Sequence, residues 1–322
     1  MNANYSSWLA PYISGLVNTK HAAGYTYERS EYYLHSFDRY CSQHPECNSL
    51  TRELVFEWAK AGVDEDPRSH NVRVSPIREL GKYMQSISVP DSYVLATALS
   101  RKSERYVPHF FTSQEIAAFF EACDKLVPYG AMRARHIVLP VFFRLLFACG
   151  LRMREARTLR IENVDLKNGC IDILRSKGCR SRKLPLPLDL LGLFRTYDAC
   201  VSGIYPNRIY FFPTTRSRGY SCSAISVAFR SIWNVAFPGG TRGTKARAYD
   251  FRHHFALSNL NRWVAAGLDV NSMLPYLSRY MGHSCLESTD YYLHLVPEFF
   301  QTFSEKVRPT ELLLPEPDYG EE

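Results

Sequence analysis

The stretch YMGHSCLESTDYYLHL, residues 280–295, places a Gly-His pair ahead of two adjacent tyrosines. In one straight helix, the nine steps from His283 to Tyr292, at about 100° each, would direct the two rings to opposite faces. The rings can converge only if the helix is interrupted. Capping patterns that begin at Ser284 and at Ser288 indicate an interruption between the two rings. The stretch therefore predicts that His283 and one of the tyrosines meet at a single site.

Three further segments place charged residues where a fold could gather them. In GLRMREARTLR, Glu155 follows Arg152 at the i,i+3 spacing that lets a carboxylate hold a guanidinium. Lys177 stands at the expected tip of a hairpin. In YDFRHHFALSNL, Arg252 lies in the first turn of a helix beside Tyr249, where an unpaired buried charge would be costly. Taken singly, these residues are also explained by a surface ion pair, a solvated lysine and an arginine that reaches solvent.

The net charge of the chain favours a polyanionic partner. The 322 residues are 46% apolar and carry a formal charge of +7. Residues 309–322 hold five acids and no Lys or Arg, so residues 1–308 carry +12 (7 plus 5). Nucleic acid is the first choice of partner for such an excess, although a basic soluble enzyme can carry the same charge. We expect a cytoplasmic protein with no membrane association, because neither a signal-peptide pattern nor an apolar run of about 20 residues occurs.

The cysteines do not indicate a disulfide framework or a metal centre. All nine are irregularly spaced, which is typical of reduced thiols. Cys41, His44 and Cys47 have a spacing that metal ligands can use, but they offer only three ligands and no second cluster follows. We therefore expect no metal and no bound cofactor.

The N-terminal third is predicted to be helical. Residues 27–44 place Tyr33, Phe37, Tyr40 and Cys41 on one helical face. The segments LTRELVFEWAKAG, with Thr51 as its N-cap, and VSPIRELGKYMQSI predict two further helices.

The remainder of the chain changes period twice. Thr112 and Glu115 form a capping box ahead of a helix, and HIVLPVFFRLLFACG predicts a buried helix that ends at Gly150. GCIDILR and RKLPLPL alternate like strands, with SKGCRS as the hairpin loop, and a helical pattern resumes at about residue 222. The expected fold class is mainly α with a small antiparallel β-hairpin or sheet.

These patterns predict four parts of the chain. Residues 1–100 form a helical domain, residues 101–111 a linker, residues 112–308 a second domain, and residues 309–322 an acidic, mobile tail. The basic linker segment SRKSERYVPHFF is either a solvated hinge or a track along a phosphate backbone.

Together, the order Arg, Lys, Arg-His, Gly-His, Tyr resembles the tyrosine recombinases, also called the phage-integrase family, from about residue 105 to 296. The resemblance implies that residues 1–100 are a core-binding domain that clamps DNA and that residues 112–308 are catalytic. It implies that the catalytic residues are Arg152, Lys177, Tyr249, Arg252, His283 and Tyr292, with Glu155 as a support for Arg152. In the motif T-x-x-Y-x-H the nucleophile is Tyr292, and Tyr291 is a packing neighbour.

One position departs from the family pattern. Most members have His or Lys where this chain has Tyr249. A phenol, with a pKa of about 10, can donate a hydrogen bond to a phosphate but supplies no positive charge. The sequence leaves the role of Tyr249 open.

The resemblance implies site-specific recombination of double-stranded DNA through a 3′-phosphotyrosine intermediate, without metal, cofactor or ATP. It implies a homotetramer on DNA formed from free monomers or weak oligomers, in a two-domain, Xer-like layout. The segment VPEFFQTFSEKV would dock either on its own domain or on a neighbouring protomer. Two other functions use the same fold: a type IB topoisomerase-like nicking-closing enzyme, and a non-catalytic accessory factor that only binds DNA.

Overall fold

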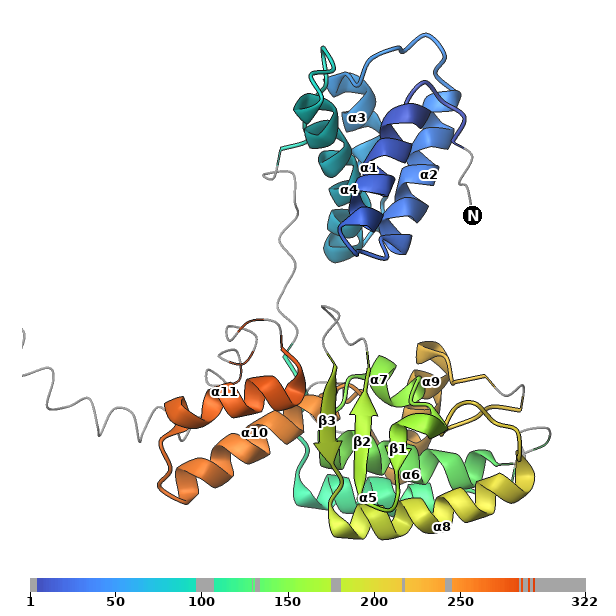
Figure 1. The fold of residues 1–322 in the computed structure, drawn as a ribbon, viewed down its shortest axis with the longest axis vertical. Coiled ribbons are helices and arrows are strands. Elements are labelled where there is room, and N and C mark those ends of the chain that lie inside the picture. Colours follow the sequence, from blue (N-terminus) through green and yellow to red (C-terminus); the bar gives the residue numbers. More distant parts are fainter. Residues whose placement is uncertain are drawn as a thin grey trace, which may run out of the picture. The chain divides into compact units, whose positions relative to one another are not determined.

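The computed structural model describes residues 5–96, 107–128, 130, 134–174, 181–215, 218–240, 245–283, 285, 289 and 292. The chain divides into two units, Met1–Tyr106 and Val107–Glu322 (Figure 1). Each unit has its own hydrophobic core. Within the described ranges, every helix is too short or too polar to cross a membrane. The mainly α fold with a small antiparallel sheet is confirmed.

The first unit is a four-helix domain. Its helices are α1 (Ala10–Ala22), α2 (Glu28–Ser42), α3 (Arg52–Ala59) and α4 (Pro67–Ser86). The predicted N-cap at Thr51 is confirmed, because its hydroxyl accepts the N–H of Leu54 at 3.3 Å. Helix α4 begins before the predicted Val74, because the Asp66 carboxylate caps its first turn.

The buried face of α2 is rotated from the predicted one. Phe37 and Cys41 are buried as expected, whereas Tyr33 and Tyr40 are only half-buried. A tyrosine at the edge of a core can bury its ring while its hydroxyl stays in water, so aromatic spacing alone placed these two residues too deep. The inner face consists of Leu34, Phe37, Asp38 and Cys41.

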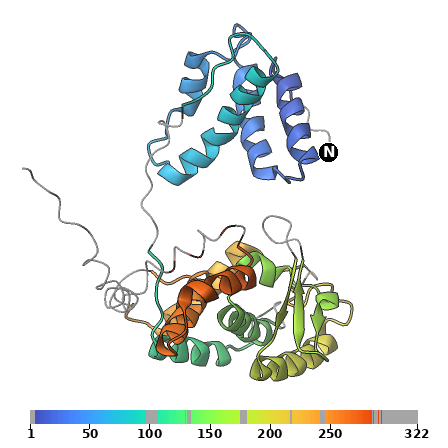
Figure 2. The same cartoon turned by 60° about the vertical axis from the view of Figure 1, so that its left-hand side comes forward.

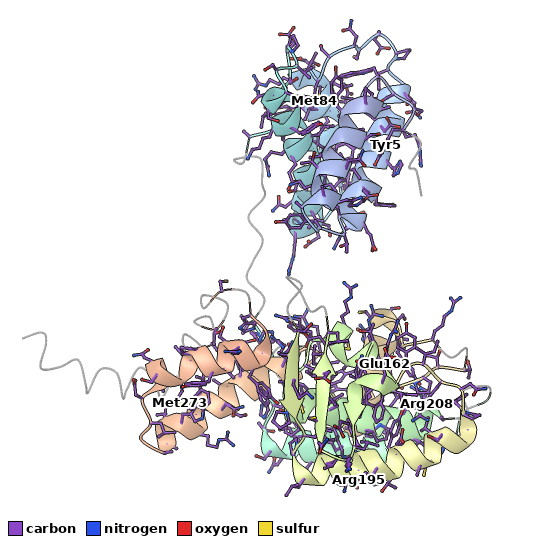
Figure 3. The ribbon with its side chains drawn as sticks, viewed as in Figure 1. Tyr5, Met84, Glu162, Arg195, Arg208 and Met273 are labelled. Carbon is purple, nitrogen blue, oxygen red and sulfur yellow. The ribbon has the colours of Figure 1, made fainter. Side chains whose placement is uncertain are left out.

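Asp38 joins α2 to the segment that enters α1. Its carboxylate accepts the backbone N–H and the hydroxyl of Ser6 at 2.8 and 3.2 Å. It also accepts the N–H and the hydroxyl of Ser7, at 3.0 and 2.6 Å. Beside this contact the ring of Tyr5 stacks on His35 of α2, with centroids 4.3 Å apart (Figure 3). Asp38 is only 3% exposed, so these four donors satisfy a buried anion.

The second unit surrounds one buried helix. Its helices are α5 (Ser113–Asp124), α6 (Arg135–Cys149), α7 (Met153–Arg157), a 3-10 turn (Ile161–Asn163), α8 (Leu188–Ile204), α9 (Cys222–Ala236), α10 (Asp250–Ala265) and α11 (Val270–Met281). Helix α6 packs against α5, α8 and α10 and is apolar on nearly every side, as predicted. The capping box of Thr112 and Glu115 is confirmed. In Figures 1 and 2, α10 and α11 (orange) lie side by side.

The sheet contains one strand more than the predicted hairpin. Strands β1 (Val164–Asp165), β2 (Cys170–Ile173) and β3 (Arg182–Pro185) are antiparallel in the order β1-β2-β3. Ile171 pairs with Leu184, and Ile173 pairs with Arg182, the first residue of β3. Helix α8 also lay outside the predicted elements. It is tied to the turn after β1 by Arg195, which donates from Nε and Nη2 to the Leu166 carbonyl at 3.1 and 2.8 Å (Figure 3).

Replacement of Asp38 tests whether its hydrogen bonds to Ser6 and Ser7 hold α2 to the segment that enters α1. We expect Asp38→Ala to destabilise the first unit by about 2–4 kcal/mol, because buried donors to a charged acceptor lose their partner. Hydrogen exchange of the α1 and α2 amides should accelerate, while that of α6 amides stays unchanged. Asp64→Ala removes an exposed carboxylate from the same unit and serves as the control. Equal protection of the α1 and α2 amides in the two variants would contradict this role of Asp38.

Candidate active site

A glycine turn directs Arg152 into the site. Gly150 ends α6 with φ of 56°, and a Cβ there would lie 2.5 Å from the ring of Phe255, so only glycine fits. The chain then enters α7, with Arg152 at its N-cap. The Arg152 N–H donates to Glu155 Oε2 at 3.0 Å, and Nη1 donates to Oε1 at 2.9 Å. The predicted pairing of Arg152 with Glu155 is confirmed.

A second arginine shares this carboxylate. Arg182 donates from Nη1 to Glu155 Oε1 at 3.0 Å and from Nη2 to Oε2 at 2.8 Å. Its Nε donates to the Tyr280 carbonyl at 2.7 Å, so β3 is joined to the end of α11. The sequence analysis missed Arg182, because a charge at the start of a short strand usually faces solvent. Glu155 therefore fixes two guanidinium groups with a side chain that is 5% exposed.

The end of α11 closes the same cluster. Gly282 has φ of 68°, and a Cβ there would lie 2.6 Å from Arg182 Nη1. Its carbonyl accepts Arg152 Nη2 at 2.5 Å. The helix thus ends at Met281, with Gly282 as its C-cap, before the predicted interruption that begins at Ser284. Between His283 and Tyr292 the structure describes Thr289, whereas Ser284 and Ser288, where the predicted capping patterns begin, lie outside the described residues.

Arg252 is the buried centre of the site. It is 1% exposed, so the alternative of an arginine that reaches solvent is wrong. Nη1 donates to the Gly150 carbonyl at 2.7 Å, and Nη2 donates to the Met281 carbonyl at 2.8 Å and to His283 Nε2 at 2.9 Å. Burial and then the charge of Arg152 lower the pKa of Arg252. Its three acceptors are uncharged groups, so they leave its positive charge uncancelled.

His283 is neutral and has a defined tautomer. Burial, then the charges of Arg252 and Arg152, lower its pKa to about 3. Because Nε2 accepts from Arg252, the ring proton lies on Nδ1, which donates to Thr289 Oγ1 at 2.8 Å. The sequence analysis placed Thr289 in the motif before the nucleophile but did not predict this bond.

Tyr292 meets His283, as the sequence predicted. The two rings are nearly parallel, at 12°, with centroids 6.3 Å apart. His253 of α10 contacts the Tyr292 ring from another side, with centroids 5.5 Å apart. Tyr292 belongs to the apolar cluster between α10 and α11 and is 3% exposed. The neighbouring Tyr291 lies outside the described residues.

Of the other two predicted site residues, Tyr249 is described by the structure and Lys177 is not. Tyr249 precedes α10, is 43% exposed, and contacts the ring of His253 at 5.2 Å between centroids. Lys177 lies outside the described residues, and β2 and β3 flank its segment.

The cluster is an anion site beside an open cavity. Arg152 and Arg182 bind the single carboxylate of Glu155 and Arg252 binds His283 beside them, so the three guanidinium groups and one carboxylate carry +2 (3 minus 1). A cavity of about 1010 Å³ between β3 and α11 is lined by Arg182, His283, Lys183 and Arg279. In the part of the chain that the structure describes, no three His, Cys, Asp or Glu side chains are grouped to hold a metal. A phosphodiester suits this charge and shape.

The lowered pKa of His283 makes stability depend on pH. The unfolded imidazole takes up its proton near pH 6.5, whereas the folded one stays neutral down to about 3. The contribution of the neutral His283 to the free energy of unfolding is therefore fully present above about pH 6.5 and is lost as the pH falls toward 3. Allowing for solvent screening, we expect His283 to account for about 1 kcal/mol of this loss by about pH 5.

Urea unfolding followed at several pH values measures this effect. His283→Gln should flatten the decline between about pH 6.5 and 5. A decline that persists in full without His283 would contradict the neutral, buried imidazole.

Comparison with known proteins agrees with this geometry. Residues 109–298 match the model of the phage integrase family. A putative integrase/recombinase, y4rE, of Sinorhizobium fredii is 24% identical over 297 residues, which are 90% of this chain and 92% of that protein. Tyrosine recombinase XerA of Pyrococcus furiosus is 24% identical over 247 residues, 74% of this chain and 77% of its own.

A solved structure shares the fold. The Tn1549 transposon integrase in complex with transposon right end DNA superposes with a TM-score of 0.60 at 15% identity. The match covers 92% of this chain and 99% of that one. Because the family match spans more than half of the sequence and contains the whole Arg152–Glu155–Arg252–His283–Tyr292 cluster, the chain belongs to the phage integrase family of tyrosine recombinases.

Proposed function

We propose that this protein is a site-specific DNA recombinase that cleaves and rejoins DNA through a 3′-phosphotyrosine intermediate. The observation that carries the proposal is that Arg152 and Arg252 are bonded to Gly282 and His283 at the end of α11, and that the ring of His283 lies against the ring of Tyr292. These residues come from three separate helix ends, and a protein that only binds DNA has no need of a buried tyrosine among them.

The arginines would stabilise the charge that develops on phosphorus. Attack on a phosphodiester builds negative charge on the nonbridging oxygens, and donors fixed in advance stabilise it without reorganising. Arg152, with a side chain 18% exposed, is placed to contact those oxygens directly. Arg252 is deeper, so it would act first through its field, which is weakly screened in a buried site.

The bond changes then follow from the groups present. The Oη of Tyr292 forms a bond to phosphorus, and the bond from phosphorus to the 5′-oxygen breaks. His283 Nε2 would accept the phenol proton once Arg252 turns from that nitrogen to the bound phosphate, whose negative charge would raise the lowered pKa of His283. The leaving 5′-oxygen needs a proton, and the family resemblance assigns that donation to Lys177. A second 5′-hydroxyl reverses the step on a new strand, so neither ATP nor a metal is consumed.

Cleavage requires access to the phenol. Tyr292 is 3% exposed in the free protein, so a phosphate can reach its oxygen only if covering groups move when DNA binds. Residues 1–100 and the catalytic residues 112–308 would together clamp the duplex, joined by the predicted linker. Four protomers would bring two recombination sites together. The segment VPEFFQTFSEKV and the tail 309–322 lie outside the described residues.

Removal of the nucleophile tests the proposal directly. The target site is first located by footprinting on DNA that flanks the gene, and a nicked suicide substrate is built from it. With chelator and without ATP, the wild-type protein should form a covalent protein–DNA adduct. Tyr292→Phe should bind the same DNA and form none, whereas Tyr291→Phe should still form the adduct. An adduct with Tyr292→Phe would assign the attack to another residue.

Loss of one site arginine should slow cleavage without abolishing DNA binding. We expect Arg152→Gln to lower the rate of adduct formation by about 10²–10³, or about 3–4 kcal/mol, as for the loss of one oxyanion donor. Arg144→Gln breaks an ion pair with Asp124 on the surface of α6 and is the matched control. Equal rates in the two variants would remove Arg152 from the reaction.

The same target site, carried on a supercoiled plasmid and on the nicked substrate, separates the competing functions. Relaxation of supercoiled DNA by a monomer, with no exchange between paired sites, would favour a topoisomerase-like enzyme. Tight binding with no adduct would favour an accessory factor. Strand exchange between two sites is the outcome that we expect.

A further inference from the structure

Four rings contact one another in series from the surface to the centre of the site. Tyr249 and His253 are separated by one turn of α10 and meet edge to face, with centroids 5.2 Å apart and planes at 70°. His253 then contacts Tyr292 at 5.5 Å, and Tyr292 lies parallel to His283 at 6.3 Å. All three separations are within the range of favourable aromatic pairs. We call these four side chains the ring series.

The two ends of the ring series differ in how they are held. At the inner end, His283 is fixed by bonds to Arg252 and to Thr289. At the outer end, Tyr249 is 43% exposed and contacts the ring of His253 edge to face. The Tyr292 ring therefore lies between the hydrogen-bonded imidazole of His283 and the ring of His253, which in turn contacts Tyr249.

His253 contributes its shape rather than a charge. Burial, then the charges of Arg252 and Arg247, lower the pKa of His253 to about 4, so the ring is neutral near pH 7. A neutral imidazole beside the phenol cannot stabilise a phenolate by charge. It can restrict the positions of the Tyr292 ring, and placement of a nucleophile within about 1 Å changes rates as much as 10²-fold.

We propose that Tyr249 and His253 are positioning residues, which hold the nucleophilic ring of Tyr292 through ring contacts rather than through contact with the phosphate. This inference rests on the proposed recombinase function. It assigns the work of position 249 to the aromatic ring and makes its hydroxyl dispensable.

Paired substitutions distinguish the contribution of the aromatic ring from that of the polar group at Tyr249 and at His253. Tyr249→Phe and His253→Phe keep a ring, whereas Tyr249→Leu and His253→Asn remove it. At saturating nicked DNA we expect the two phenylalanine variants to form adduct within about threefold of the wild-type rate. The two variants without a ring should be slower by about 10- to 100-fold, with an unchanged Kd for DNA. His253→Phe should also leave the pH–rate profile between about pH 6 and 9 unmoved, because a neutral ring has no proton to exchange there.

His254→Asn is the matched control. This neighbouring histidine is half-buried on the same helix but stacks on Phe147, with centroids 5.5 Å apart, so its loss should not slow the adduct. Thermal unfolding checks that each variant folds. If His253→Asn does not fold, the exposed position 249 still decides the question.

Each outcome has one reading. If Tyr249→Phe is as slow as Tyr249→Leu, the hydroxyl acts on the phosphate and the inference is wrong. If both ringless variants match the wild type, the ring series does not position Tyr292. If the wild type itself forms no adduct, the proposed function fails before the inference is tested.

Discussion

A buried cation at the ends of two helices is the constraint on which the site depends. The guanidinium of Arg252 lies between the C-terminal carbonyls of α6 and α11, at Gly150 and Met281. Such carbonyls have no partner within their own helices and carry the negative end of the helix dipole. Arg252 thus satisfies two helix ends that the chain would otherwise have to cap by other means. The two helices are held where their following residues, Arg152 and His283, enter one cluster.

This arrangement explains why the site keeps its positive charge. Three carboxylates, one for each arginine, would stabilise the fold but cancel the field that a phosphate needs. Here Arg152 and Arg182 share both oxygens of Glu155, and Arg252 is bound by dipoles alone. Burial and the remaining charge lower the pKa of His283 and keep its ring neutral in the free protein. Structural support and catalytic preparation are therefore supplied by the same few hydrogen bonds.

The sequence predicted what local patterns encode and missed what only tertiary packing creates. The end of α6 at Gly150, the capping box at Thr112 and the pairing of Arg152 with Glu155 each depend on residues a few positions apart. The third contact of Glu155, with Arg182, joins residues 27 positions apart and has no local signal. Helix α8 did have one, since Leu190, Phe194, Tyr197 and Val201 follow a helical period, but the prolines and strand-like alternation just before it concealed its start. Tertiary context also decided which face of α2 is buried, because Asp38 goes inside to bind the chain before α1.

The departure at position 249 is consistent with this balance of charge. The Arg152–Arg182–Arg252 cluster has an excess of two positive charges over Glu155, and Arg247 adds a further cation near His253. Burial, and then the charge of Arg152, lower the pKa of Arg252, so a further cation close by would be unfavourable. A lysine or a charged histidine at 249 would add to that repulsion at the exposed rim. A phenol adds none, and its ring extends the packing that surrounds Tyr292. Tyrosine at this position therefore exchanges one more charge at the phosphate for a more rigid nucleophile.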